Sequence, residues 1–110
     1  MVKFMAMMKR RDDITLEEFS RYWYEAHGRF AYAVPNLRRY VQNHAIRLPG
    51  GGEPPFDGIG EYWFDDLKSW QRSSEFYLGD EGKAILEDEA KFMDRSKIFG
   101  LVTEERIYIP

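Results

Sequence analysis

The apolar residues of this chain change their spacing several times, and the order of these changes is the strongest constraint on its fold. A spacing of two residues indicates a strand, and a spacing of three to four residues indicates a helix. Strands are expected over residues 2–8, 37–47, 59–64 and 101–109. Helices are expected over residues 15–34, in a short segment capped by Asp65 or Asp66, and over 80–96. The pattern therefore predicts the order β-α-β-β-α-β in a single domain, residues 1–110.

The first expected helix has clear boundary signals. Thr15 and Glu18 match a capping box, in which each side chain bonds the backbone N–H of the other residue. Pro35 marks the end, because the residue before a proline is biased away from helical backbone. The run L-P-G-G-G-E-P-P-F that follows the second strand is a loop by composition.

This order of elements predicts a ferredoxin-like α+β protomer, in which a four-stranded antiparallel sheet carries its helices on one face. Met5 and Met7 place apolar side chains on the other face, and the strand over 59–64 is apolar on both sides. A contiguous bare apolar surface usually marks an interface. We therefore expect a homodimer in which two sheets close as an α+β barrel and bury about 800 Å² per partner.

Composition argues against several classes of partner. The formal net charge is -3 and both signs are interleaved, which does not suggest binding to nucleic acid or to a membrane. The apolar runs are too short to span a bilayer. The chain has no cysteine, which excludes disulfides and thiolate chemistry. The basic residues near the start follow the first apolar stretch, the reverse of a signal peptide, so the expected location is the cytoplasm.

His27 is the most informative single residue, because it falls inside the apolar stripe of the first helix. The other members of that stripe are Leu16, Phe19, Trp23, Phe30 and Val34. A buried titratable ring must find a hydrogen-bond partner or take part in chemistry. The second histidine, His44, lies on an expected strand, on the same side as Tyr40. The functional question is whether both imidazole rings share a pocket.

Several motifs of the chain resemble those of the EthD family of small dimeric α+β barrel proteins. They are F-x-x-Y-W-x-x-x-H ending at His27, P-x-L-R-R-Y-x-x-N-H ending at His44, E-Y-W-F-D at 61–65 and T-E-E at 103–105. The resemblance covers nearly the whole chain. It implies a ferredoxin-like protomer, a dimeric barrel and a pocket between helices and sheet. Similar proteins include isomerases, dehydratases and cyclases that move protons on small carbonyl compounds without a metal or redox cofactor.

The candidate catalytic residues are His27, His44 and Tyr40. An imidazole titrates near neutral pH and is a suitable base. The tyrosine hydroxyl could stabilise a developing enolate oxygen. The expected substrate-binding walls are aromatic: Phe4, Phe19, Trp23, Phe30 and Trp63. Each has a plainer interpretation: His27 as a core histidine bonded to a backbone carbonyl, His44 at the sheet margin, Tyr40 and the aromatic stripe as packing.

Three function classes remain open from the sequence. The first is a cofactor-independent isomerase, dehydratase or cyclase that acts on a small carbonyl, lactone or aromatic polyketide-like compound, with His27 as base. The second is a non-catalytic binding or accessory protein of an ether- or aromatic-degradation system, and the third is a cofactor-free barrel monooxygenase. The two histidines lack the spacing of a metal site, and nothing else supports haem, so no cofactor or metal is expected.

Overall fold

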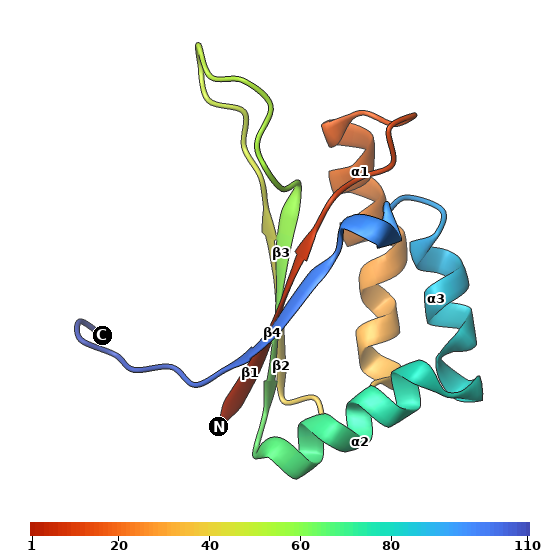
Figure 1. Ribbon diagram of the computed structural model, residues 1–110, viewed down its shortest axis with the longest axis vertical. Helices are drawn as coiled ribbons and strands as arrows, with labels where there is room; N and C mark the ends of the chain where they lie inside the picture. The colour runs from red at the N-terminus through yellow and green to blue at the C-terminus, as the bar shows by residue number, and fades with distance from the viewer.

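The structure is a computed structural model that describes residues 1–110 and shows one twisted sheet with helices on one of its faces (Figure 1). The strands are β1 (Val2–Met8), β2 (Arg39–His44), β3 (Gly58–Phe64) and β4 (Phe99–Thr103). The α-helices are α1 (Leu16–Tyr22), α2 (Leu67–Leu78) and α3 (Lys83–Glu89). Shorter helical turns are η1 (Trp23–His27), η2 (Gly28–Ala33), η3 (Asp80–Gly82) and η4 (Arg95–Lys97).

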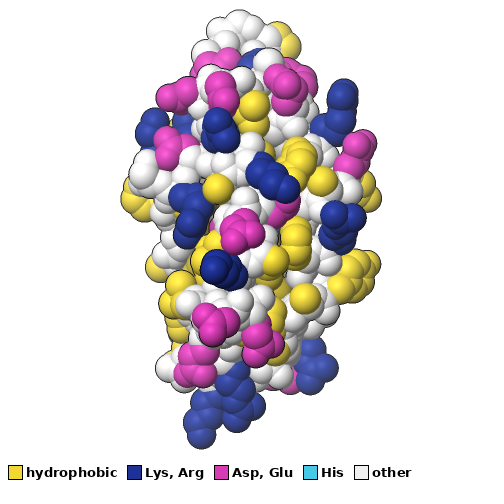
Figure 2. Space-filling view, turned by 90° about the vertical axis from the view of Figure 1, so that its right-hand side faces the viewer, with side chains coloured by type: hydrophobic (Ala, Val, Ile, Leu, Met, Phe, Trp, Pro, Cys, Tyr) yellow, Lys and Arg dark blue, Asp and Glu magenta, His cyan; other side chains and the backbone are white.

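The sheet has the strand order β2-β3-β1-β4, and every neighbouring pair is antiparallel. Consecutive strands therefore interleave across the sheet, which is the ferredoxin-like arrangement. The predicted fold class and order of elements are confirmed. No helix in the chain combines the length and the apolarity that crossing a bilayer requires. The surface on the helix side carries Lys and Arg side chains interspersed with Asp and Glu (Figure 2).

Some expected boundaries were wrong, and each error has a tertiary cause. The chain leaves the helix expected over 80–96 after Glu89, because backbone bonds from Arg11 to Phe92 and from Asp94 to Lys9 draw it back to the sheet. The helix that Asp66 caps, expected to be the shorter one, is instead the longest. The last strand ends at Thr103 instead of 109, because its register on β1 runs out at Lys3.

A buried carboxylate closes the loop between β2 and β3. Asp57 is fully buried, and its oxygens accept from the Arg10 backbone N–H at 2.7 Å and from the Arg10 guanidinium at 2.6 Å. Its own backbone bonds Met8 and Ala45. A buried charge is tolerated only when it is paired in this way. The clasp defines where β3 begins, and with it the end of β2.

The first helical segment changes its geometry twice. It starts at the Thr15–Glu18 capping box, as predicted, and is α-helical only to Tyr22. One π turn and a 3-10 turn then continue it to Ala33. In the π turn the Gly28 N–H donates to the Trp23 carbonyl, which also accepts from the Gln42 side chain at 3.1 Å. A side chain on Gly28 would meet that amide at 2.9 Å, so the π turn sits tightly against β2.

The core lies where this segment meets α3 and β1. Its fully buried members are Phe19, Trp23 and Phe92, with Met8 and Met93 beside them. The Phe19 ring packs on both Trp23 and Phe92, with centroids 5.8 and 5.4 Å away. The aromatic stripe of the first helix is therefore mostly core, and only its later turns reach the site.

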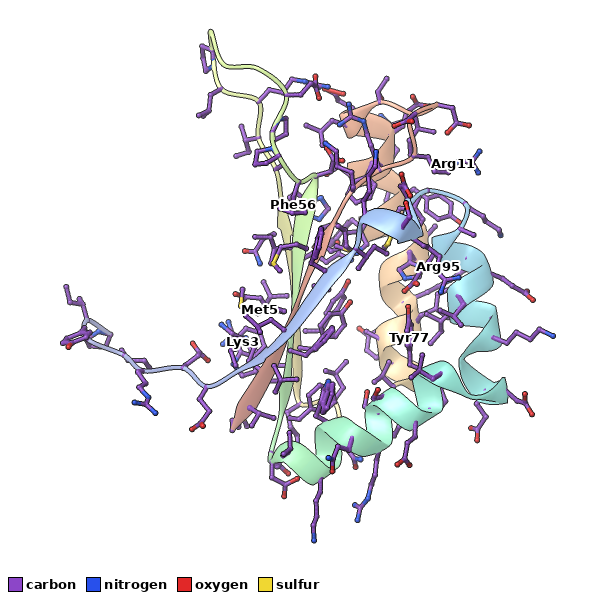
Figure 3. All side chains as sticks on the ribbon, in the orientation of Figure 1. Lys3, Met5, Arg11, Phe56, Tyr77 and Arg95 are labelled. Carbon is purple, nitrogen blue, oxygen red and sulfur yellow. The ribbon has the colours of Figure 1, made fainter.

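The opposite face of the sheet carries no helix. Lys3 and Met5 point away from the helices, whereas Tyr77 lies on the helix side (Figure 3). By strand register, the side chains on this face include Met7, Val41, Ile59, Trp63, Phe99 and Leu101. Phe99 and Leu101 are more than half exposed, so a largely apolar surface is left open in the single chain.

We expect Gly58→Ala to destabilise the fold. A Cβ at this position would lie 2.6 Å from the Trp23 ring, which is itself fully buried and cannot move aside. Overpacking of this kind costs about 1–3 kcal/mol of unfolding free energy. Urea denaturation should show the loss, and Gly52→Ala is the matched control because nothing lies within 4 Å of its added methyl. Equal stability of the two variants would contradict the packing described here.

Candidate functional site

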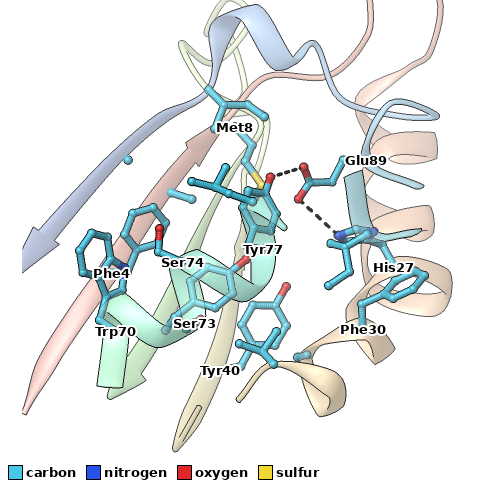
Figure 4. A pocket seen from close by; sticks show the side chains of 18 of the residues that line it. Phe4, Met8, His27, Phe30, Tyr40, Trp70, Ser73, Ser74, Tyr77 and Glu89 are labelled. Atoms are coloured by element: carbon cyan, nitrogen blue, oxygen red, sulfur yellow. Dashed lines mark hydrogen bonds and ion pairs between the residues drawn. The ribbon is translucent and has the colours of Figure 1, made fainter. Parts of the chain in front are cut away.

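A cavity of about 300 Å³ lies between the helix layer and the sheet (Figure 4). Most of its lining is apolar or aromatic, with side chains that include Phe4, Met8, Phe30, Trp70 and Ile85. The polar groups on its wall come from His27, Glu89, Ser73, Ser74 and the tyrosines at 40, 62 and 77. A few polar groups in an apolar cavity are typical of a small-molecule site.

One wall of the cavity is a histidine held by a carboxylate. His27 is 7% exposed, and its Nδ1 lies 2.7 Å from Oδ2 of Asp88, while the Tyr22 hydroxyl donates to Oδ1 of the same group at 2.6 Å. Burial acts to raise the pKa of Asp88, but the bonds from Tyr22 and His27 outweigh it and lower that pKa. An ionised carboxylate only accepts hydrogen bonds, so Nδ1 carries the proton and a neutral ring leaves Nε2 as a base.

Glu89 stands beside that base. Its Oε2 lies 3.9 Å from His27 Nε2, too far for a direct hydrogen bond, and its Oε1 accepts from the Tyr77 hydroxyl at 2.6 Å. Burial raises the pKa of Glu89 above its ordinary value, against the opposing effects of Tyr77 and His27. Burial, together with the charge of Glu89, likewise raises the pKa of Tyr77.

These groups can carry a proton to and from a bound molecule. His27 and Glu89 both lie on the cavity wall, and both can hold or release a proton near neutral pH. Neither is tied to the backbone: the partner of His27 is a carboxylate, not the backbone carbonyl of the plainer interpretation. The His27–Asp88 bond orients the ring, as a second group commonly orients a catalytic base.

The structure brings together only some of the predicted site residues. Phe4, Phe30 and Tyr40 line the cavity with His27. Phe19 and Trp23 do not reach it, because both are fully buried in the core behind the site. Trp63 lies on the opposite face of the sheet, between the cations of Lys3 and Arg39, and its indole N–H donates to Glu105 at 2.7 Å. The alternation of β3 excludes Trp63 from the wall.

The expectation that both imidazoles share the pocket was wrong. His44 is outside the cavity lining and packs on Trp23, with ring centroids 4.6 Å apart. Its Nδ1 is hydrogen-bonded to the Ser20 hydroxyl and its Nε2 lies 2.8 Å from the Gln42 carbonyl oxygen. The Trp23 indole separates the two imidazoles, since it fills the space between helix and strand where they would have met. Burial lowers the pKa of His44.

Sequence reasoning missed Asp88, Glu89, Tyr77 and Tyr62. For Glu89 a signal was present, because it falls four residues after Ile85 and three before Phe92, on the apolar side of its helix. A carboxylate at such a position has the same standing as the buried His27. Asp88 gave no comparable signal. No group of three or more His, Asp and Glu side chains converges as metal ligands.

The raised pKa of Glu89 predicts a pH-dependent cost to stability. As pH rises above the ordinary glutamate pKa, the unfolded chain ionises before the buried carboxyl does, so stability falls. We expect Glu89→Gln, which keeps an acceptor for Tyr77, to remove this fall. Denaturation between pH 4 and 8 should show the variant gaining on the wild type as pH rises. The exposed Glu87→Gln on the same helix serves as control. A pH-independent difference would contradict the prediction.

Comparison with known proteins places these observations in a family. The model of the EthD domain matches residues 11–96. The structure is similar to that of an EthD family protein from Bacillus halodurans C-125, with 27% identity, a TM-score of 0.71, and coverage of 96% of this chain and 99% of the other. No curated protein matches the sequence.

Two further structures are similar in fold alone. An EthD-like protein from Ralstonia eutropha JMP134 is 17% identical, with a TM-score of 0.70 and coverage of 98% of this chain and 94% of that one. A protein of unknown function from Bacteroides fragilis NCTC 9343, described as dimeric and ferredoxin-like, is 19% identical, with a TM-score of 0.64 and coverage of 94% and 95%. With the family model matching most of its length, this chain belongs to the EthD family.

Proposed function

We propose that this protein binds a small, largely apolar carbonyl compound in the cavity and moves a proton on it, as an isomerase, dehydratase or cyclase does. The observation that carries the proposal is the 3.9 Å gap between His27 Nε2 and Glu89 Oε2 on the wall of an apolar cavity. Two proton-carrying groups that face a common space, and do not bond each other, can each reach a ligand atom placed between them.

In this proposal His27 is the base. Asp88 holds the Nδ1 proton and stabilises the imidazolium that forms when Nε2 takes a proton from the carbon beside the carbonyl. Glu89, its pKa raised by burial, returns or relays a proton at a neighbouring position. The cavity volume equals that of about ten water molecules in the liquid, which suits a one- or two-ring compound. This proton transfer needs no redox group or metal.

A second candidate is a binding protein that holds such a compound without changing it. The mostly apolar lining favours this alternative, because it supplies affinity without chemistry. The two candidates differ in one measurable property. An enzyme of the proposed class exchanges a ligand's acidic C–H with solvent, whereas a binding protein does not.

We expect the wild-type protein to exchange the C1 protons of 2-tetralone, a two-ring ketone, with D2O faster than buffer does. His27→Asn keeps a donor for Asp88 and removes the base, and Glu89→Gln removes the second proton carrier. Each should lower the protein-dependent rate about 100-fold or more. Proton NMR of the C1 signal measures the rate, and Glu87→Gln should leave it unchanged.

Two results would contradict the assignment. Full exchange in folded His27→Asn would remove His27 from the role of base. Binding of the ketone with no exchange above buffer would support the binding-protein alternative. Oxygen consumption with a hydroquinone would indicate the third class, the cofactor-free monooxygenase.

We further propose that the bare sheet face forms a homodimer. Met5, Ile59, Phe99 and Leu101 lie on this face, and a large exposed apolar patch is uncommon on a monomer (Figure 3). The Bacteroides fragilis structure with the same fold is described as dimeric. Two such faces packed together would give the barrel expected from the sequence.

We expect Leu101→Glu to weaken this dimer, because the new carboxylate would be buried without a partner. The dissociation constant should rise at least about tenfold. Sedimentation equilibrium measures it, and Leu67→Glu, which places the same charge at an exposed site on the helix side, is the matched control. A monomeric wild-type protein, or an unaffected Leu101→Glu dimer, would refute this interface.

A further inference from the structure

We propose that Gln42 and His44, which lie outside the cavity lining, hold the Tyr40 hydroxyl as a hydrogen-bond donor toward the cavity. The ligand at that end must then present an acceptor oxygen, as a ketone, lactone or enolate does, and not a hydroxyl that needs an acceptor. This inference rests on the proposed function only in requiring that the cavity binds a small molecule. It assigns Gln42 and His44 as positioning residues.

The orientation of the Gln42 amide follows from the Trp23 carbonyl. One terminal atom of the Gln42 side chain lies 3.1 Å from that backbone oxygen and 2.8 Å from the Tyr40 hydroxyl. A backbone carbonyl can only accept, so this atom is the amide nitrogen. Gln42 therefore donates to Tyr40, and the Gln42 oxygen faces the other way.

His44 locks this orientation from the far side. Its Nε2 lies 2.8 Å from the Gln42 oxygen, so Nε2 carries a proton and donates. In the neutral ring Nδ1 is then an acceptor, and the Ser20 hydroxyl is the group bonded to it. The lowered pKa of His44, caused by burial, agrees with a neutral ring. Donors and acceptors match along the chain from Ser20 to Tyr40.

The Tyr40 oxygen is thus supplied with donors, while its own proton has no protein acceptor assigned. Gln42 donates to it, and Trp23 packs behind the same network. The Tyr62 ring lies against Tyr40, with centroids 4.8 Å apart. Burial is the largest cause that raises the pKa of both hydroxyls. The contact between them lowers the pKa of Tyr40 and raises that of Tyr62, as when Tyr62 donates.

Local structure explains why these groups line up. Tyr40, Gln42 and His44 alternate along β2 and so face the helices together. The π turn brings the Trp23 carbonyl to the strand, and Gly28 leaves room for the amide. Tyr40 and the His27–Glu89 pair both line the cavity (Figure 4). A carbonyl oxygen on Tyr40 would leave the adjacent acidic carbon free to face the proton carriers.

The test compares a ketone with its alcohol and reads the ketone's carbonyl stretch. The probes are 2-tetralone with a ¹³C-labelled carbonyl and 2-tetralol, and the variants are Tyr40→Phe and Gln42→Glu. A carboxylate at position 42 accepts the Tyr40 proton and turns a lone pair of the hydroxyl toward the cavity. Asn43→Asp is the control, because it makes the same amide-to-acid change on the opposite face of β2.

In the wild-type protein we expect the carbonyl stretch of bound 2-tetralone to lie below its value in hexane, and the shift to vanish in Tyr40→Phe. Gln42→Glu should weaken ketone binding about tenfold while leaving alcohol binding equal or tighter. A merely structural role for Gln42 would weaken both probes equally. Asn43→Asp should leave both affinities and the shift unchanged.

Two outcomes would overturn the inference. A wild-type protein that binds the ketone with no shift, or a Gln42→Glu variant with unchanged preference between the probes, would show that Tyr40 is not the donor. Proton exchange by His27 and Glu89 could then still stand, since it is measured separately. Failure of the wild-type protein to bind either probe would overturn both this inference and the proposed function.

Discussion

The bond between His27 and Asp88 is the interaction on which the site depends. It joins the end of the π turn to the last turns of α3, two segments 61 residues apart. Removing one partner of a buried pair leaves an uncompensated polar group and costs about 3–5 kcal/mol. Because Tyr22 bonds the same carboxylate, three side chains hold the helix layer in one arrangement. The cavity lies beneath this arrangement and owes its polar wall to it.

Asp88 and Glu89 are neighbours in sequence with opposite electrostatic behaviour. Asp88 receives two hydrogen bonds and has a lowered pKa, whereas burial dominates at Glu89 and raises its pKa. Environment alone therefore separates two similar acids into an orienting carboxylate and a proton carrier. Such a separation is common where acid–base chemistry takes place near neutral pH.

The two faces of the sheet serve different purposes. Even-numbered residues of β1 contribute Phe4, Ala6 and Met8 to the cavity, while the odd-numbered side chains face away from the helices. One strand thus supports a binding site and leaves an apolar surface available to a second subunit. The same alternation on β2 presents Tyr40, Gln42 and His44 together, which links a cavity residue to groups outside it.

Sequence alone determined the order of elements, the capping box at Thr15, the two-sided character of β1 and the buried position of His27. Each of these depends on local periodicity or on side-chain chemistry within a few residues. Only the tertiary structure decided where α3 ends, which aromatic residues face the cavity, and which partner His27 has. Trp23 was expected on the wall and lies in the core, because the change from α to π geometry cannot be read from periodicity. His44 was expected beside His27, yet a strand position specifies only a face of the sheet. The distance along that face, and the indole that fills it, depend on how distant segments pack.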